Sequence, residues 1–171
     1  RLDPLTATLS HLDALAALVG GIAGITAHFA TPPFQQQELT HPSIHQVLSS
    51  YDVIGGPHSL SMLYATSRFR DANPQWVSVV ISALEAADAF IAGDPRAAAE
   101  LYIKAEKSNL SADFVEALLR DPQNRCTIEP QAIMAFARFQ QHTARTTVVP
   151  GDWRSVFFPE PTQKSGAEPP T

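Results

Sequence analysis

Capping residues and prolines divide the chain after residue 66 into a series of helices. Asn73-Pro74 and Asp94-Pro95 each place a proline in a first helical turn, where its missing N–H would have no helical partner in any case. The first of these helices ends at Gly93, and Ser111 can accept a backbone hydrogen bond at the start of a third. We therefore expect helices over 74–93, from 95, from 112 to a stop at 121–122, and from 130 to 140, with a last short element over 153–158.

The chain before residue 66 has a different pattern. Ser10 can cap a helix over 11–19, which Gly20-Gly21 ends, and Pro32-Pro33 can begin a short helix over 34–39. The small and apolar residues 22–29 are typical of a strand that is buried on both faces, and we expect further strands over 44–49 and 60–65. Buried strands followed by helices predict an α/β fold. Because two or three strands cannot make a sheet for so many helices, the pattern indicates the C-terminal half of a larger α/β protein.

The composition excludes several classes of partner. The chain has 171 residues, 44% of them hydrophobic, so it is long and apolar enough to bury a core. The formal net charge is -5 and no run is rich in Lys or Arg, so we expect neither nucleic acid nor an anionic membrane surface as a partner. The best candidate for a membrane-spanning segment, 12–25, is short and interrupted by glycines. A single cysteine, Cys126, excludes an internal disulfide.

Three successive segments resemble one protein family. They are 11–18 (HLDALAAL), 28–39 (HFATPPFQQQEL) and 50–57 (SYDVIGGP), and the likeness continues through 69–74, 83–87, 94–99 and 153–160. In this order and spacing they are similar to the periplasmic substrate-binding proteins of nitrate/sulfonate/taurine-type ABC importers, which also include binders of thiamine-pyrimidine precursors. The resemblance covers about residues 10–160.

The resemblance implies a solute-binding protein that holds a small organic molecule, such as a sulfonate, an aromatic acid or a pyrimidine-like compound, in a cleft between two lobes. The fold would be the C-terminal half of a two-lobed type 2 periplasmic-binding-protein fold, helix-rich after residue 66. Residues 1–54 would end the second lobe, 55–59 would be a hinge crossing, 60–158 would complete the first lobe, and 159–171 would be a disordered tail. The implied location is periplasmic, or extracytoplasmic and membrane-anchored, and no signal for it is present in this sequence. The implied partners are an ABC permease in the membrane and the missing N-terminal half of the same protein; no cofactor is expected.

The first candidate ligand-binding segment is 28–34. It follows an expected strand and precedes an expected helix, which is where open α/β sheets bind their ligands. His28, Phe29 and Phe34 could hold an aromatic or apolar ligand body, and Thr31 lies in the turn before the helix. Free N–H groups near Phe34 and Gln35 could hold a polar head. The alternative is that both phenylalanines belong to the core and that His28 bonds to the backbone.

The second candidate segment contains Tyr51 and Asp52. A phenol and a carboxylate beside a flexible crossing could bind an amine or a ring nitrogen of the ligand. The alternative is that Tyr51 is packed and Asp52 caps a turn. Gly55 and Gly56 could absorb the backbone rotation of a hinge when ligand binds.

Metal binding and catalysis find little support in the sequence. His41 and His45 have the i, i+4 spacing of a metal-binding helix, but Pro42 lies between them, so we expect no metal site there. There is no G-x-S-x-G motif, and Cys126 has no histidine in its segment that could activate it. We therefore expect no enzyme.

Two alternatives to solute capture remain open. The first is a purely helical interaction domain over 67–158, whose apolar stripes bind a partner protein; it predicts no strand pairing over 22–29 and 60–65. The second is an enzyme on the same two-lobed scaffold, which predicts ionisable groups that converge in the cleft.

Overall fold

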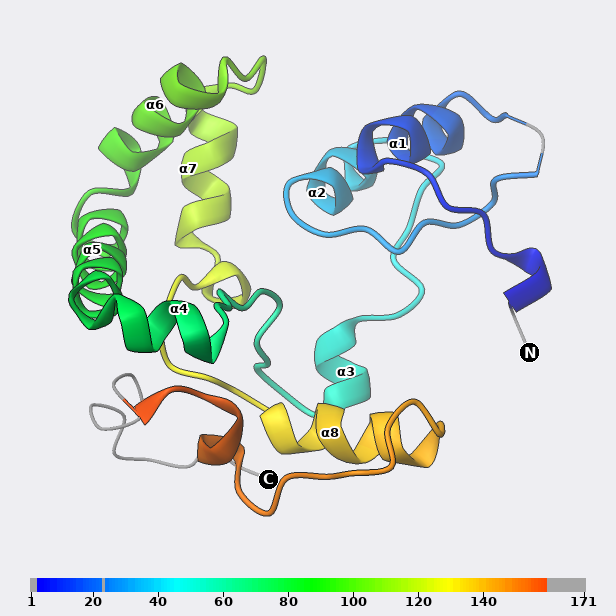
Figure 1. Cartoon of the computed structure of the whole chain (residues 1–171). Coiled ribbons are helices and arrows are strands. Elements are labelled where there is room, and N and C mark those ends of the chain that lie inside the picture. Colours follow the sequence, from blue (N-terminus) through cyan, green and yellow to red (C-terminus); the bar gives the residue numbers. More distant parts are fainter. Residues whose placement is uncertain (1–2, 23, 160–171) are drawn as a thin grey trace. The chain divides into compact units, whose positions relative to one another are not determined.

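The computed structural model describes residues 3–22 and 24–159. The chain divides into two compact units, Arg1–Val47 and Leu48–Thr171 (Figure 1). Within the described residues every regular element is helical, with eight α-helices, three short 3-10 helices and no strand.

The first unit contains the 3-10 helix η1 (Asp3–Leu5) and the helices α1 (His11–Val19) and α2 (Phe34–Leu39). The side-chain oxygen of Ser10 accepts the backbone N–H of Asp13 at 3.1 Å, so the expected cap of α1 is confirmed. Ala14 and Ala17 of α1 are buried, and α1 packs against α2. The expected helix over 34–39 is also confirmed.

The second unit contains the remaining helices. They are α3 (Ser50–Ile54), α4 (Ser67–Ala72), α5 (Pro74–Gly93), α6 (Pro95–Glu106), α7 (Ala112–Arg120), η2 (Pro122–Asn124), α8 (Ile133–His142) and η3 (Trp153–Val156). The starts of α5, α6 and α7 are those that the capping residues predict. Helices α6 and α7 form a hairpin around Ala98, Ala99 and Val115, and the 0% exposure of Ala99 shows that the two helices leave no space at this point.

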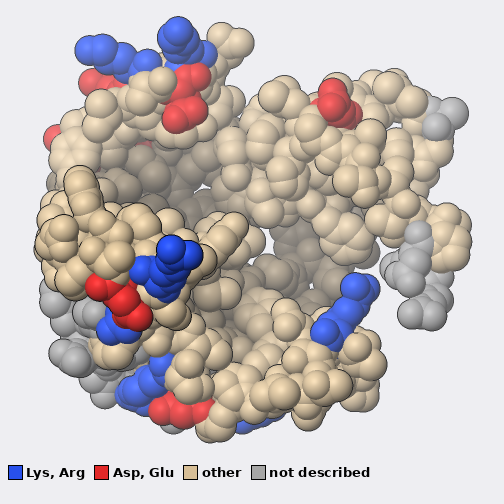
Figure 2. Space-filling model, in the orientation of Figure 1, with Lys and Arg blue, Asp and Glu red and all other residues tan. Residues whose placement is uncertain are grey.

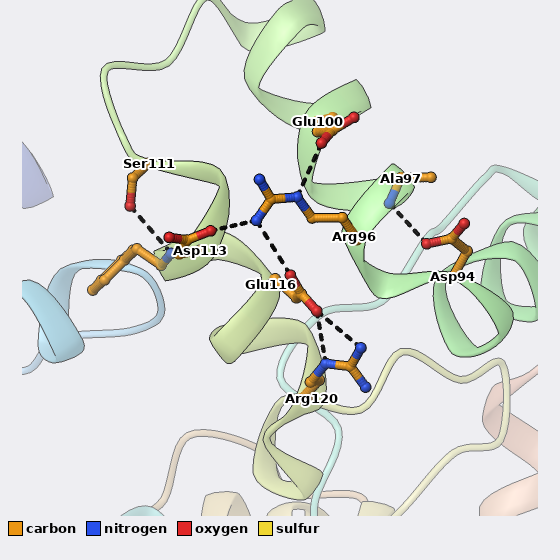
Figure 3. Close-up of polar contacts among 9 residues, drawn as sticks. Asp94, Arg96, Ala97, Glu100, Ser111, Asp113, Glu116 and Arg120 are labelled. Carbon is orange, nitrogen blue, oxygen red and sulfur yellow. Dashed lines mark hydrogen bonds and ion pairs between the residues drawn. The ribbon is translucent and has the colours of Figure 1, made fainter.

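An ion-pair network joins the two helices of this hairpin (Figure 3). The Arg96 guanidinium on α6 contacts Glu100 on its own helix at 2.9 Å, and Asp113 and Glu116 on α7. Glu116 also pairs with Arg120 at 2.8 Å. The hydrogen bond with Asp113 is the main reason why the pKa of Arg96 is raised further above its ordinary value, so this guanidinium remains charged.

The long helix α5 has no buried residue. Its apolar residues do not pack into a core of the chain, as shown by the side chains of Trp76 and Phe90, which are 54% and 43% exposed. By length and composition α5, and not the segment 12–25, is the helix among the described residues that could cross a membrane. One such helix is weak evidence for a membrane span. Most of the face shown in Figure 2 carries no charged side chain, and at several places on it a positive group lies beside a negative one.

The α/β fold class is contradicted. Residues 22–29, 44–49 and 60–65, which were expected to be strands, form no strand wherever the structure describes them. Most of their described apolar side chains are exposed, as shown by Phe29 at 83%, Val47 at 85% and Tyr64 at 92%. A strand is stable only when a second strand completes its hydrogen bonds, and no described segment provides one. The described chain is therefore not an α/β lobe of the type 2 binding-protein kind.

Several boundaries also differ from the expected ones. Helix α8 begins at Ile133 rather than at Pro130 because Gln131 is held outside the helix by Ser59: the Gln131 N–H donates to Ser59 Oγ at 2.9 Å, and the Ser59 N–H donates to the Gln131 carbonyl at 3.1 Å. Helices α3 and α4 were not predicted. The expected disordered tail lies outside the described residues except for Pro159.

Candidate functional site

A histidine and a glutamate from the first unit form an enclosed pair. The His28 imidazole Nδ1 lies 2.5 Å from Oε1 of Glu38, and the two side chains are 10% and 6% exposed. His28 lies in the irregular segment between α1 and α2, and Glu38 lies on α2, where it is the buried polar residue of that helix. Buried carboxylates need hydrogen-bond partners, so this contact ties the irregular segment to α2.

A second histidine extends the pair into a chain of three polar side chains. The His11 Nδ1, at the first position of α1, lies 3.1 Å from Nε2 of His28. The His11 ring also stacks on Phe34, with 5.1 Å between ring centroids and 15° between planes. We call His11, His28, Phe34 and Glu38 the histidine cluster. It combines hydrogen-bonding groups with aromatic faces, which is the composition of many small-molecule sites.

The structure brings some of the predicted ligand residues to this cluster. His28 and Phe34 belong to it, and the neighbouring Phe29 is 83% exposed, so its ring is available to a ligand rather than part of a core. The Thr31 carbonyl accepts the N–H groups of Phe34 at 2.9 Å and of Gln35 at 3.3 Å. The expectation that these N–H groups hold a polar head is therefore wrong, because they already have partners.

The second predicted segment lies in the other unit. The Tyr51 hydroxyl donates to the Gln123 carbonyl at 3.0 Å, and its ring packs edge-on against His58. The side-chain oxygen of Ser49 caps α3 by accepting the Tyr51 N–H. Asp52 lies exposed in the first turn of α3, where its charge suits the helix dipole. These contacts give Tyr51 a packing role; a ligand role for either residue stays a prediction.

Gly55 and Gly56 end helix α3. Gly55 has φ 90° and Gly56 φ 150°, and the N–H groups of both donate to the Tyr51 carbonyl. Glycine is favoured in this left-handed conformation, which explains its use here. The division between the two compact units falls at Val47 and Leu48, several residues before the glycines. A hinge role for them stays a prediction.

Two residues of the histidine cluster were missed by sequence reasoning. His11 was taken only as the start of a helix, and Glu38 only as a helical residue. A second feature was also missed: the sequence contains no Lys or Arg from residue 2 to residue 67. The histidine cluster therefore has no permanently positive side chain of its own unit beside it within the described residues.

The other chemically active groups do not form a comparable site. Among the described residues, no group of three or more His, Cys, Asp or Glu side chains could hold a metal ion. A cavity of about 630 Å³ in the second unit is lined by the second half of α5 and by residues 119–122 and 125–129, including Asp88 and Cys126. Cys126 is exposed, but partial desolvation by the surrounding protein, and secondly the Asp88 carboxylate, raise the pKa of its thiol, which lowers its thiolate fraction at neutral pH.

No protein-family model, no curated protein and no solved structure matches the chain. The family resemblance therefore depends on the quoted segments alone, and one of them, 28–39, contains three members of the histidine cluster.

Proposed function

We propose that the chain is the solute-binding component of an ABC importer and that it captures a small organic molecule at the histidine cluster. The observation that carries this proposal is the chain of contacts from Glu38 through His28 to His11, with Phe34 stacked on its end and Phe29 exposed beside it. Polar atoms beside aromatic faces suit a planar organic ligand, which stacks on a ring and hydrogen-bonds at its edge.

The charges around the cluster narrow the class of solute. A sulfonate or carboxylate head needs cationic side chains or free backbone N–H groups. The first unit has no Lys or Arg in its described residues, and the N–H groups at the start of α2 are already bonded to Thr31. The carboxylate of Glu38 would also repel an anion. An uncharged heteroaromatic solute of the pyrimidine-like class therefore fits better than a sulfonate or an aromatic acid.

A binding screen of the full chain tests the proposal. Calorimetry and thermal shift against pyrimidines, aromatic acids and sulfonates should give binding by the first class and little by the other two. Phe29→Ala should weaken that binding, whereas Phe139→Ala, which removes a comparably exposed phenylalanine in the second unit, should leave it unchanged. Absence of binding by all three classes of compound would contradict solute binding at the cluster. An equal loss of binding in Phe29→Ala and Phe139→Ala would contradict it as well.

One observation favours a second function, protein interaction through α5. Trp76, Val80, Leu84 and Phe90 lie along one side of this helix and are all exposed, which is unusual for a contiguous apolar stripe. Because the stripe has no charged residue, its partner would offer an uncharged apolar face. The combined substitution Trp76→Ser and Leu84→Gln should reduce self-association or adsorption of the chain while leaving binding at the histidine cluster intact.

A further inference from the structure

The tautomers of His11 and His28 decide which hydrogen-bonding group the histidine cluster offers to a solute. We infer that Glu38 fixes both tautomers, so that His11 presents a bare Nε2, a hydrogen-bond acceptor, and that the captured solute is a molecule with an N–H or O–H donor. The statement about the solute rests on the proposed function; the statement about the tautomers does not.

The inference starts from the carboxylate. An ionised Glu38 can only accept hydrogen bonds, so the contact at 2.5 Å requires a proton on Nδ1 of His28. With neutral imidazoles, Nε2 of His28 then carries a lone pair. The nitrogen 3.1 Å from it, Nδ1 of His11, must be the donor in that contact. His11 therefore has its proton on Nδ1, and its Nε2 is an acceptor.

The acceptor at the end of the chain is accessible. Within the described residues, the buried side-chain nitrogens and oxygens that lack a hydrogen-bond partner are Gln36 Oε1 and Trp153 Nε1. The Nε2 of His11 has no partner among those residues and is not one of these buried atoms, so it is at least partly accessible on the half-buried His11 ring. Stacking on Phe34 restrains the plane of the His11 ring, and with it the direction in which Nε2 accepts.

The described residues of the first unit supply no Lys or Arg side chain as a donor. Gln36 Oε1, on α2, is a second acceptor of the first unit without a partner in the described residues. That unit has no Lys or Arg after Arg1 to satisfy either acceptor. An acceptor that loses contact with water and finds no donor costs free energy. A solute with an N–H or O–H group that bonds to this acceptor should therefore bind more tightly than a solute that lacks such a group.

Nitrogen-15 NMR of the imidazole rings tests the tautomers without any ligand. At a pH where both rings are neutral, His11 and His28 should each show a protonated Nδ1 and a bare Nε2, while His45, exposed and without a partner in the described residues, serves as the reference ring. In Glu38→Gln the amide can donate as well as accept, so the fraction of His11 with a proton on Nε2 should rise. A proton on Nε2 of His11 in the unaltered protein would overturn the inference.

A matched pair of ligands tests the class of solute. The unaltered chain should bind 4-aminopyrimidine about tenfold more tightly than 4-methylpyrimidine, which has a similar shape and lacks the donor. His11→Phe keeps a ring on Phe34 and removes Nε2, so it should abolish this preference, and His45→Phe should retain it. Equal affinity for the two compounds in the unaltered chain would overturn the statement about the solute. If no class of compound binds at all, the proposed function fails, and the tautomers are judged from the spectra alone.

Discussion

Nδ1 of His28 lies 2.5 Å from Oε1 of Glu38, across nine intervening residues and between two side chains that are almost fully enclosed. This contact closes the irregular segment 28–33 onto helix α2. It also provides the fixed end of the hydrogen-bond chain that reaches His11.

Removal of the Glu38 carboxylate should destabilise the chain. Glu38→Ala leaves the enclosed His28 without its partner, which should lower the free energy of unfolding by about 1.5–3 kcal/mol. Glu38→Gln can still hydrogen-bond and should cost less. Chemical denaturation of both variants measures the difference, and an alanine variant as stable as the unaltered chain would contradict the enclosed pair.

The cap of helix α7 should contribute measurable stability. The Ser111 hydroxyl oxygen accepts the Phe114 N–H at 3.2 Å, so Ser111→Ala should lower the free energy of unfolding by about 1 kcal/mol. Ser82→Ala, at an exposed position within α5, is the matched control and should not lower the free energy of unfolding, because alanine has the higher helix propensity. Equal denaturation curves for the two variants would show that the cap does not form.

The Arg96 network should be sensitive to salt. Arg96→Gln removes the cation that links α6 to α7, and at low ionic strength it should lower the melting temperature modestly, because the network is exposed. The difference should shrink near 1 M salt, where screening acts over about 3 Å. Arg138→Gln, at an exposed position on α8, should show neither effect. A loss of the same size at both salt concentrations would point to packing rather than charge.

Alkylation of Cys126 should require a higher pH than that of an ordinary thiol. Although the Cys126 residue is exposed, partial desolvation by the surrounding protein raises the pKa of its thiol first, and the Asp88 carboxylate second, so the thiolate forms only as the pH rises above the ordinary range. Asp88→Asn should move the midpoint of the alkylation rate to lower pH, though not to the ordinary value, since the partial desolvation remains. Glu106→Gln, an exposed carboxylate at the end of α6, should not move it. The raised pKa means that the thiol holds its proton more tightly in the native state than in the unfolded state. The stability contributed by this difference is therefore lost as the pH rises through the raised pKa of Cys126.

The helices could be predicted from the sequence because their signals are local. Ser10, Asp94 and Ser111 each accept a backbone N–H from the residue three positions later, and this can be deduced from neighbouring residues alone. The expected strands failed because pairing depends on a second segment, and the apolar pattern of 60–65 does not say whether one is present. The start of α8 depends on Ser59, seventy-two positions before Gln131 in the sequence, which no local pattern can show.

The candidate site was predicted in part for the same reason. His28 and Phe34 lie in one short segment, so a single pattern identified both. His11 and Glu38 meet His28 only because α1 and α2 pack together, at separations of 17 and 10 residues. The i, i+4 spacing of His41 and His45 does not correspond to a shared helix face, because helix α2 ends at Leu39, before either residue.

The absence of Lys and Arg from residues 2–67 has a practical consequence for proteolysis. Trypsin cleaves only after these two residue types, so it cannot cut the first unit anywhere beyond Arg1, whether that unit is folded or open. A tryptic digest would yield an intact peptide from residue 2 to Arg68 and would report on the helices after α3 alone. Chymotrypsin, with Phe29 exposed on the chain, is the protease whose cleavage would reveal how firmly the first unit holds together.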